Sequence, residues 1–168
     1  MNIAKKYSLI ALIVLVGLLA IRSLNNNQQL LPDITFTDID GEQHSLMDYK
    51  GKPILMIFWA TDCPGCIQEM PDLIKLHNDF SGQGLTMIGV AMPHDSLDHI
   101  ISMRQTRELP YIITWDKNAG ISQAFDNIRV TPTHFLINPE GEIVMRKIGS
   151  LNLNLLYDKL YEMGLTSL

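Results

Sequence analysis

The chain has 168 residues, a hydrophobic content of 46% and a formal net charge of −5. This length and apolar content suit one folded domain with a sizeable core, which argues against a disordered chain. Without Lys5, Lys6 and Arg22, ten basic residues remain against 18 acidic ones, a net charge of −8. Because nucleic acids are bound mainly through basic surfaces, we do not expect a nucleic-acid partner.

An apolar run from Tyr7 to Ile21 follows two lysines near the N-terminus and contains no charged residue. As a helix it would extend roughly 22 Å, enough to cross a locally thinned bilayer. Residues 1–22 are therefore predicted to be a membrane anchor or a signal segment, and the poor small-x-small cleavage pattern favours a single-pass anchor. The lysine pair predicts that the remaining chain leaves the inner (cytoplasmic) membrane into the periplasm or an equivalent extracytoplasmic space.

Residues 23–31 are mostly polar amides without periodicity, which predicts a tether, and residues 32–168 are predicted to form one domain. Within the domain, residues 34–46 alternate in polarity around Asp40-Gly41, which predicts a hairpin.

Two apolar runs, residues 53–60 and 85–91, predict strands buried on both faces. Between them a helix is predicted, because apolar side chains recur at helical spacing: Ile67, Met70, Leu73, Ile74, His77 and Phe80. A strand, a helix and a strand in this order predict a crossover with parallel strands. The elements expected next are a helix capped by Asp95 or Ser96, a strand at 111–114, a helical turn near 118–125, two strands joined at 138–141, and a helix ending at Gly164.

Both cysteines of the chain, Cys63 and Cys66, lie in one short stretch, WATDCPGC. A disulfide that closes so small a loop stabilises a fold by only about 2 kcal/mol, and the five histidines show no ligand spacing with the pair that would complete a zinc site. A redox pair has positive grounds. Cys63 begins the predicted helix, where the helix dipole and free N–H groups stabilise a thiolate, and Cys66 is placed one turn later to attack a mixed disulfide on Cys63.

The stretches FWATDCPGC and VTPTHFLINPEGEI, with Pro71 five residues after Cys66, resemble the thioredoxin superfamily. The pattern CPGCIQEMP is similar to that of the membrane-anchored TlpA/ResA-type thiol-disulfide oxidoreductases. Over residues 32–163 the resemblance implies an α/β thioredoxin-like fold in which helices flank a mixed central sheet. It also implies an N-terminal β-hairpin and an inserted strand and helix, here around residues 92–114.

The resemblance also implies roles for the residues that match the family pattern. Cys63 would be the attacking thiol and Cys66 the resolving thiol of a redox-active disulfide, and Pro132 would be a cis-proline facing it. Four neighbours are assigned to substrate binding: Trp59, Pro64, Gly65 and Thr131. Trp59 is expected to pack beside the site, and Thr131 is expected to offer its backbone to the substrate.

Glu69 follows Cys66 by three residues, one helical turn. The resemblance implies that an acid at this position tunes the cysteines, since a carboxylate beside a thiol disfavours the thiolate and can relay a proton. A solvated glutamate on the helix face is the alternative. Two positions depart from thioredoxin itself: Ile57 stands in place of a buried aspartate, and Asp62 in place of the tryptophan before the first cysteine. The charge of Asp62 should oppose a thiolate at Cys63.

The function implied by the resemblance is reduction of disulfides in extracytoplasmic client proteins, such as apocytochrome c in cytochrome c maturation. A membrane thiol-disulfide electron donor would reset the pair, and neither a cofactor nor a metal is expected. The residues leave the direction of electron flow open, because about 30 mV of reduction potential corresponds to only about 1.4 kcal/mol.

Two other functions stay open. A peroxiredoxin-like peroxidase would carry a threonine three residues before its reactive cysteine, whereas Thr61 lies two residues before Cys63. A copper-handling module could combine the cysteines with His94 or His134, although His134 is predicted to be a packed strand residue. A methionine and a histidine, such as Met92 and His94, are too few to predict a metal site by themselves.

Overall fold

The computed structural model describes residues 7, 12–14, 16, 17 and 30–166. Most of the predicted anchor, residues 1–22, and residues 23–29 of the predicted tether lie outside the described residues. In the described part of the chain, no helix combines the length and the apolar character needed to span a membrane. Leu31 is buried and its N–H donates to the carbonyl oxygen of Gly141 at 2.8 Å, so the folded domain includes residue 31.

The centre of the domain is a five-stranded mixed sheet with the strand order β5-β4-β3-β6-β7. These strands are β3 (Ile54–Trp59), β4 (Thr86–Ala91), β5 (Ile112–Trp115), β6 (Thr133–Ile137) and β7 (Ile143–Ile148). The central strand β3 pairs in parallel with β4 and antiparallel with β6. All residues of β3 are buried, as expected for a strand covered on both faces.

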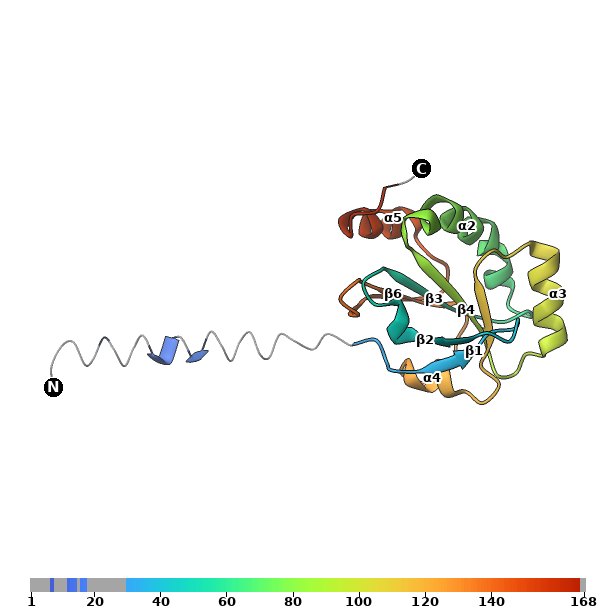
Figure 1. The fold of residues 1–168 in the computed structure, drawn as a ribbon, viewed down its shortest axis with the longest axis horizontal. Helices are drawn as coiled ribbons and strands as arrows, with labels where there is room; N and C mark the ends of the chain where they lie inside the picture. Colours follow the sequence, from blue (N-terminus) through green and yellow to red (C-terminus); the bar gives the residue numbers. More distant parts are fainter. Residues whose placement is uncertain (1–6, 8–11, 15, 18–29, 167–168) are drawn as a thin grey trace.

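Helices cover both faces of the sheet. They are α2 (Pro64–Phe80), α3 (Leu97–Arg107), α4 (Gly120–Ala124) and α5 (Leu153–Glu162), with 3-10 turns η1 (Leu46–Tyr49) and η2 (Ser81–Gln83). Helices α2 and α5 lie on one side of the sheet, and α4 lies on the opposite side together with the hairpin of β1 (Thr35–Thr37) and β2 (Gln43–Ser45) (Figure 1). The active-site candidates therefore lie on the α2 side of the sheet.

The predicted order of elements is confirmed. The crossover β3-α2-β4 has parallel strands, Ser96 caps α3 through a bond from the N–H of His99, and residues 138–142 connect β6 to β7. The predicted inward face of α2 was partly wrong, because Glu69 and Leu76 are buried whereas Ile74 is partly exposed. A charged side chain on the buried face of α2 is thus a finding of the structure.

Three phenylalanines on the α4 side of the sheet fix the strands that carry the site. The ring of Phe58 lies 5.4 Å from that of Phe125 and 5.8 Å from that of Phe135, centroid to centroid. All three side chains are fully buried. They join β3, β6 and the end of α4, so the C-terminal end of β3, the N-terminal end of β6 and the loop after α4 are held in one place.

Candidate active site

Cys63 and Cys66 form a disulfide at the point where β3 passes into α2. Cys63 is the N-cap of α2, and its sulfur accepts a hydrogen bond from the N–H of Cys66 at 3.2 Å. Pro64 occupies the first turn, where a missing N–H leaves no intrahelical bond unmade. The predicted placement of the pair at a helix N-terminus is therefore confirmed, and this environment stabilises a thiolate in the reduced protein.

The two cysteines differ in access. Cys63 is 9% exposed and Cys66 1% exposed, so a partner arriving from solvent reaches Cys63 first. Their Cα atoms are 5.3 Å apart. This arrangement suits an attacking thiol at position 63 and a resolving thiol beneath it at position 66.

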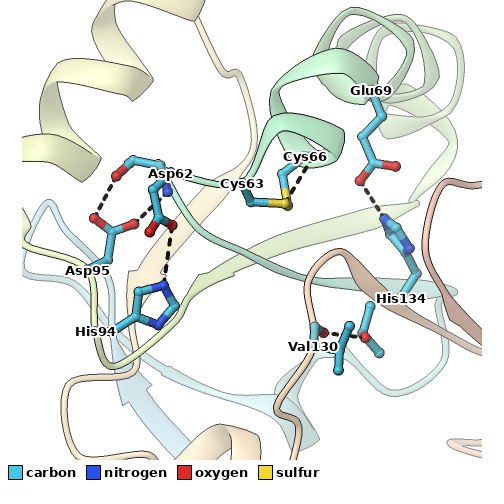
Figure 2. The surroundings of a disulfide bond; sticks show 10 residues. Asp62, Cys63, Cys66, Glu69, His94, Asp95, Val130 and His134 are labelled. Atoms are coloured by element: carbon cyan, nitrogen blue, oxygen red, sulfur yellow. Dashed lines mark hydrogen bonds and ion pairs between the residues drawn. A yellow bond between two sulfur atoms is a disulfide. The ribbon is translucent and has the colours of Figure 1, made fainter.

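The peptide bond between Thr131 and Pro132 is cis, as the resemblance implied. Pro132 is buried beside the first turn of α2, because a Cβ added at Gly65 would lie 3.5 Å from the Cδ of Pro132. The hydroxyl of Thr133 donates to the carbonyl oxygen of Val130 at 2.6 Å, which ties the two sides of the proline turn together (Figure 2). Thr131, half-buried, is thereby held next to the disulfide-bearing turn.

On the other side of Cys66, Glu69 reaches from α2 to His134 on β6, and the two form a close contact (Figure 2). The Nε2 atom of His134 lies 2.7 Å from Oε1 of Glu69, and the side chains are 0% and 8% exposed. The solvated-glutamate alternative for Glu69 is therefore wrong. His134 is packed in a strand, as predicted, but its pairing with Glu69 was not predicted.

The charge of Glu69 also reaches Tyr111, which lies on the same side of the sheet. Burial is the main cause that raises the pKa of Tyr111, and the negative charge of Glu69 raises it further. Tyr111 is 6% exposed. Its phenol therefore stays protonated and neutral over the physiological pH range, and it adds no second charge near the Glu69–His134 pair.

Asp62 and Asp95 lie on the opposite side of the disulfide (Figure 2). The Asp62 carboxylate is 3.3 Å from Nε2 of His94, and both side chains are largely exposed. Asp95 is buried and accepts hydrogen bonds from the N–H of Thr61 at 2.7 Å, from the Thr61 hydroxyl at 2.8 Å and from the N–H of Ser96 at 2.9 Å. Asp95 thus fixes the loop that leads into Cys63, a role that the sequence did not suggest.

Trp59 is 3% exposed and packs under the site. Its indole nitrogen has no hydrogen-bond partner among the described residues, and a Cβ at Gly89 would approach it to 3.1 Å. Gly89 therefore provides the space into which the indole fits. The expectation that Trp59 packs beside the site agrees with this position, and its assignment to substrate binding stays a prediction, as do those of Pro64, Gly65 and Thr131.

Neither alternative function finds its expected geometry among the described residues. The hydroxyl of Thr61, which a peroxidase reading would direct at the reactive cysteine, donates to Asp95 instead. Within the described part, three or more acidic, histidine or cysteine side chains come close enough to share a metal ion only at Asp38, Glu42 and His44, in the hairpin region and without either cysteine.

Comparison with known proteins identifies the family. Residues 28–146 match the AhpC/TSA family. This chain belongs to the AhpC/TSA family. It is 33% identical to the thiol-disulfide oxidoreductase ResA of Halalkalibacterium halodurans over 77% of this chain and 73% of the relative, and 32% identical to ResA of Geobacillus kaustophilus over 71% and 68%.

A candidate thioredoxin from Neisseria meningitidis, solved in solution, has a similar fold, with a TM-score of 0.75 and 31% identity over 82% of this chain and 91% of that chain. The resemblance to thioredoxin-like, ResA-type proteins is thus confirmed, together with the α/β fold and its mixed central sheet. The expectation of an oxidoreductase is confirmed as well, since the ResA relatives are named thiol-disulfide oxidoreductases.

Proposed function

We propose that this protein reduces disulfides in extracytoplasmic client proteins while its N-terminal segment holds it at the cytoplasmic membrane. The observation that carries the proposal is the Cys63–Cys66 disulfide at the N-terminus of α2, beside the cis bond to Pro132. The names of the ResA relatives support the reaction class. The apolar run of residues 7–21 behind a lysine pair supports the location.

The proposed reaction starts from the reduced pair. The Cys63 thiolate attacks one sulfur of a client disulfide, forms a mixed disulfide and expels the other client sulfur as a thiolate. Cys66 then loses its proton and attacks the sulfur of Cys63, which releases the second client thiol and leaves the Cys63–Cys66 disulfide. Two electrons pass from the pair to the client, and a membrane thiol-disulfide donor returns them. The backbone of Thr131 would hold the client in an extended conformation beside Pro132.

Trapping the intermediate tests this order of attack. In Cys66→Ser the mixed disulfide on Cys63 cannot be resolved, so we expect the full-length variant to accumulate client proteins through a bond that dithiothreitol cleaves. Cys63→Ser is the matched control and should trap none. Failure of the wild type to reduce insulin, together with an empty Cys66→Ser trap in extracytoplasmic extracts, would refute the proposal.

The direction of transfer and the client require separate measurements. A reduction potential close to that of thioredoxin, about −270 mV, would support a reductant, whereas a value near −120 mV would indicate an oxidant. Oxidised apocytochrome c offered as substrate should be reduced faster than a disulfide peptide of unrelated sequence if it is the client. Location is read by a reporter enzyme that is active only outside the cytoplasm, fused to the C-terminus of the full chain.

A further inference from the structure

Glu69 lies one helical turn from Cys66 and pairs with His134, but the proposed thiol-disulfide exchange does not by itself require this pair. Glu69 is three residues after Cys66 on α2, so the two side chains share a face of the helix. His134 is the second residue after Pro132 and comes from β6. The pair therefore connects the strand that follows the cis-proline to the helix face that carries the resolving cysteine.

The hydrogen bonds of the pair indicate where its proton lies. The Nδ1 atom of His134 and the Oε2 atom of Glu69 are buried and have no hydrogen-bond partner among the described residues. An imidazolium would place an N–H at Nδ1 with nothing to accept it, which costs free energy in a buried site. The favoured arrangement is a neutral imidazole that donates its Nε2–H to Oε1 of an ionised Glu69.

The hydrogen bond donated by His134 engages Oε1 of the Glu69 carboxylate and fixes its position. The second carboxylate oxygen, Oε2, is left free to accept a proton. Glu69 also lines a cavity of about 150 Å³ with Gln68, Asp72 and Ser150, which is large enough for water to carry a proton away.

We infer that His134 is a positioning residue whose hydrogen bond holds the Glu69 carboxylate in place, so that Glu69 can accept the proton of Cys66 when the mixed disulfide is resolved. The inference rests on the proposed function and adds a residue to it. In this step the Cys66 S–H bond breaks, the proton moves to Oε2 of Glu69, directly or through water, and the Cys66 sulfur bonds to Cys63. The client sulfur leaves as a thiolate, and the proton on Glu69 returns to solvent or to that thiolate.

Other titratable groups near the pair do not replace Glu69 in this role. Tyr111, which directly precedes β5, is close enough to feel the charge of Glu69 and is held neutral by burial, which raises its pKa. Asp72 lines the same cavity but is an exposed residue on α2. Lys147, exposed on β7, pairs in register with His134. Among these groups only Glu69 is a buried acid.

The test separates attack by Cys63 from resolution by Cys66. Reduced full-length protein is mixed with an aromatic disulfide whose two halves are each released as a coloured thiolate. The first release occurs when Cys63 attacks the disulfide, and the second occurs when Cys66 resolves the mixed disulfide. We expect His134→Leu to slow the second release by about tenfold or more at neutral pH, and to move its pH profile upward, while the first release changes by less than about twofold. Glu69→Gln should have the same effect, and the double variant should add nothing further.

Conservative variants distinguish positioning from packing. His134→Gln can still donate to Glu69 and should restore most of the second release, whereas the shorter His134→Asn should not, which provides a second disrupted variant if His134→Leu does not fold. His77→Leu, which removes a partly buried histidine elsewhere on α2, should leave both releases unchanged. A second release that is unchanged or faster in the folded His134→Leu or His134→Asn variant would overturn the inference. Insulin reduction by the wild type tests the proposed function separately.

Discussion

Two carboxylate–histidine pairs flank the disulfide on opposite sides, and they differ chiefly in burial (Figure 2). Asp62 and His94 lie 3.3 Å apart with 76% and 57% of their side chains exposed. Glu69 and His134 lie 2.7 Å apart with 8% and 0% exposed. Water screens the first pair and leaves it a small interaction energy, whereas loss of one partner of the second leaves a buried polar group without its hydrogen bond.

Proximity to a cysteine in the sequence therefore does not show which acid has the larger effect on the site. Asp62 directly precedes the attacking Cys63, but its side chain is exposed to solvent and contacts His94. Glu69 is three residues beyond Cys66, but its side chain is buried, where charges interact more strongly. Substitutions in the buried Glu69–His134 pair should accordingly change stability and reactivity strongly, whereas substitutions in the exposed Asp62–His94 pair should change them little.

Disrupting the buried pair should have the largest effect on stability. We expect His134→Ala to lower the free energy of unfolding by about 3 kcal/mol or more, because it leaves both a cavity and a buried carboxylate without its donor. Urea unfolding of the oxidised protein measures the change. The matched variant His94→Ala should cost less than about 0.5 kcal/mol, and equal losses in the two variants would contradict the contrast.

Asp95 is a buried acid that lies on the same side of the disulfide as the exposed Asp62–His94 pair. It therefore tests whether burial, and not the side of the disulfide, decides how much an acid contributes to stability. Asp95→Ala leaves two donors of Thr61 and the N–H of Ser96 without their acceptor. We expect the free energy of unfolding to fall by about 2 kcal/mol, in the range for buried groups left unpaired. Asp62→Ala is the matched control and should be nearly neutral in the same urea titration; a loss as large as that of Asp95→Ala would show that burial does not decide the outcome.

Most of the fold could be predicted because its elements carry strong local patterns. The apolar runs of β3 and β4 and the spacing of α2 identify a parallel crossover, and the position of Cys63 at the start of α2 follows from that crossover. The cis bond at Pro132 was anticipated only through the family resemblance. Nothing in the local sequence around a proline specifies its isomer, which the fold imposes.

The Glu69–His134 pair could not be predicted because each partner looks ordinary by itself. A glutamate on a helix is usually solvated, and strand alternation in β6 could not assign a face to His134 because every residue of β6 is buried. The partners are 65 positions apart in sequence, and only the packing of α2 across β6 brings them together. Burial of Asp95 escaped prediction for the same reason, since its main partner, Thr61, is 34 positions away.

His77 is an intermediate case between the two pairs, partly buried and with no partner for its Nδ1 atom among the described residues. Desolvation by burial lowers the pKa of His77 below its ordinary value of 6.5. The unfolded chain therefore binds a proton at this position at higher pH than the folded protein does, and stability declines as pH falls through 6.5 toward the lower folded value. Urea titrations at several pH values should show a shallower decline in His77→Leu than in the wild type, and identical slopes would exclude this contribution.

The smallest expected effect concerns Asp62 and the reactivity of Cys63. At separations of several ångströms in water, a unit charge changes the energy of a neighbouring thiolate by less than about 1 kcal/mol, so Asp62→Asn should speed alkylation of reduced Cys63 by about twofold at a pH where the thiol is mostly protonated. High salt should remove the difference, because exposed charges are screened. A tenfold, salt-resistant gain in Asp62→Asn would instead place Asp62 in the same electrostatic class as Glu69, and burial would no longer explain how the two sides of the disulfide differ.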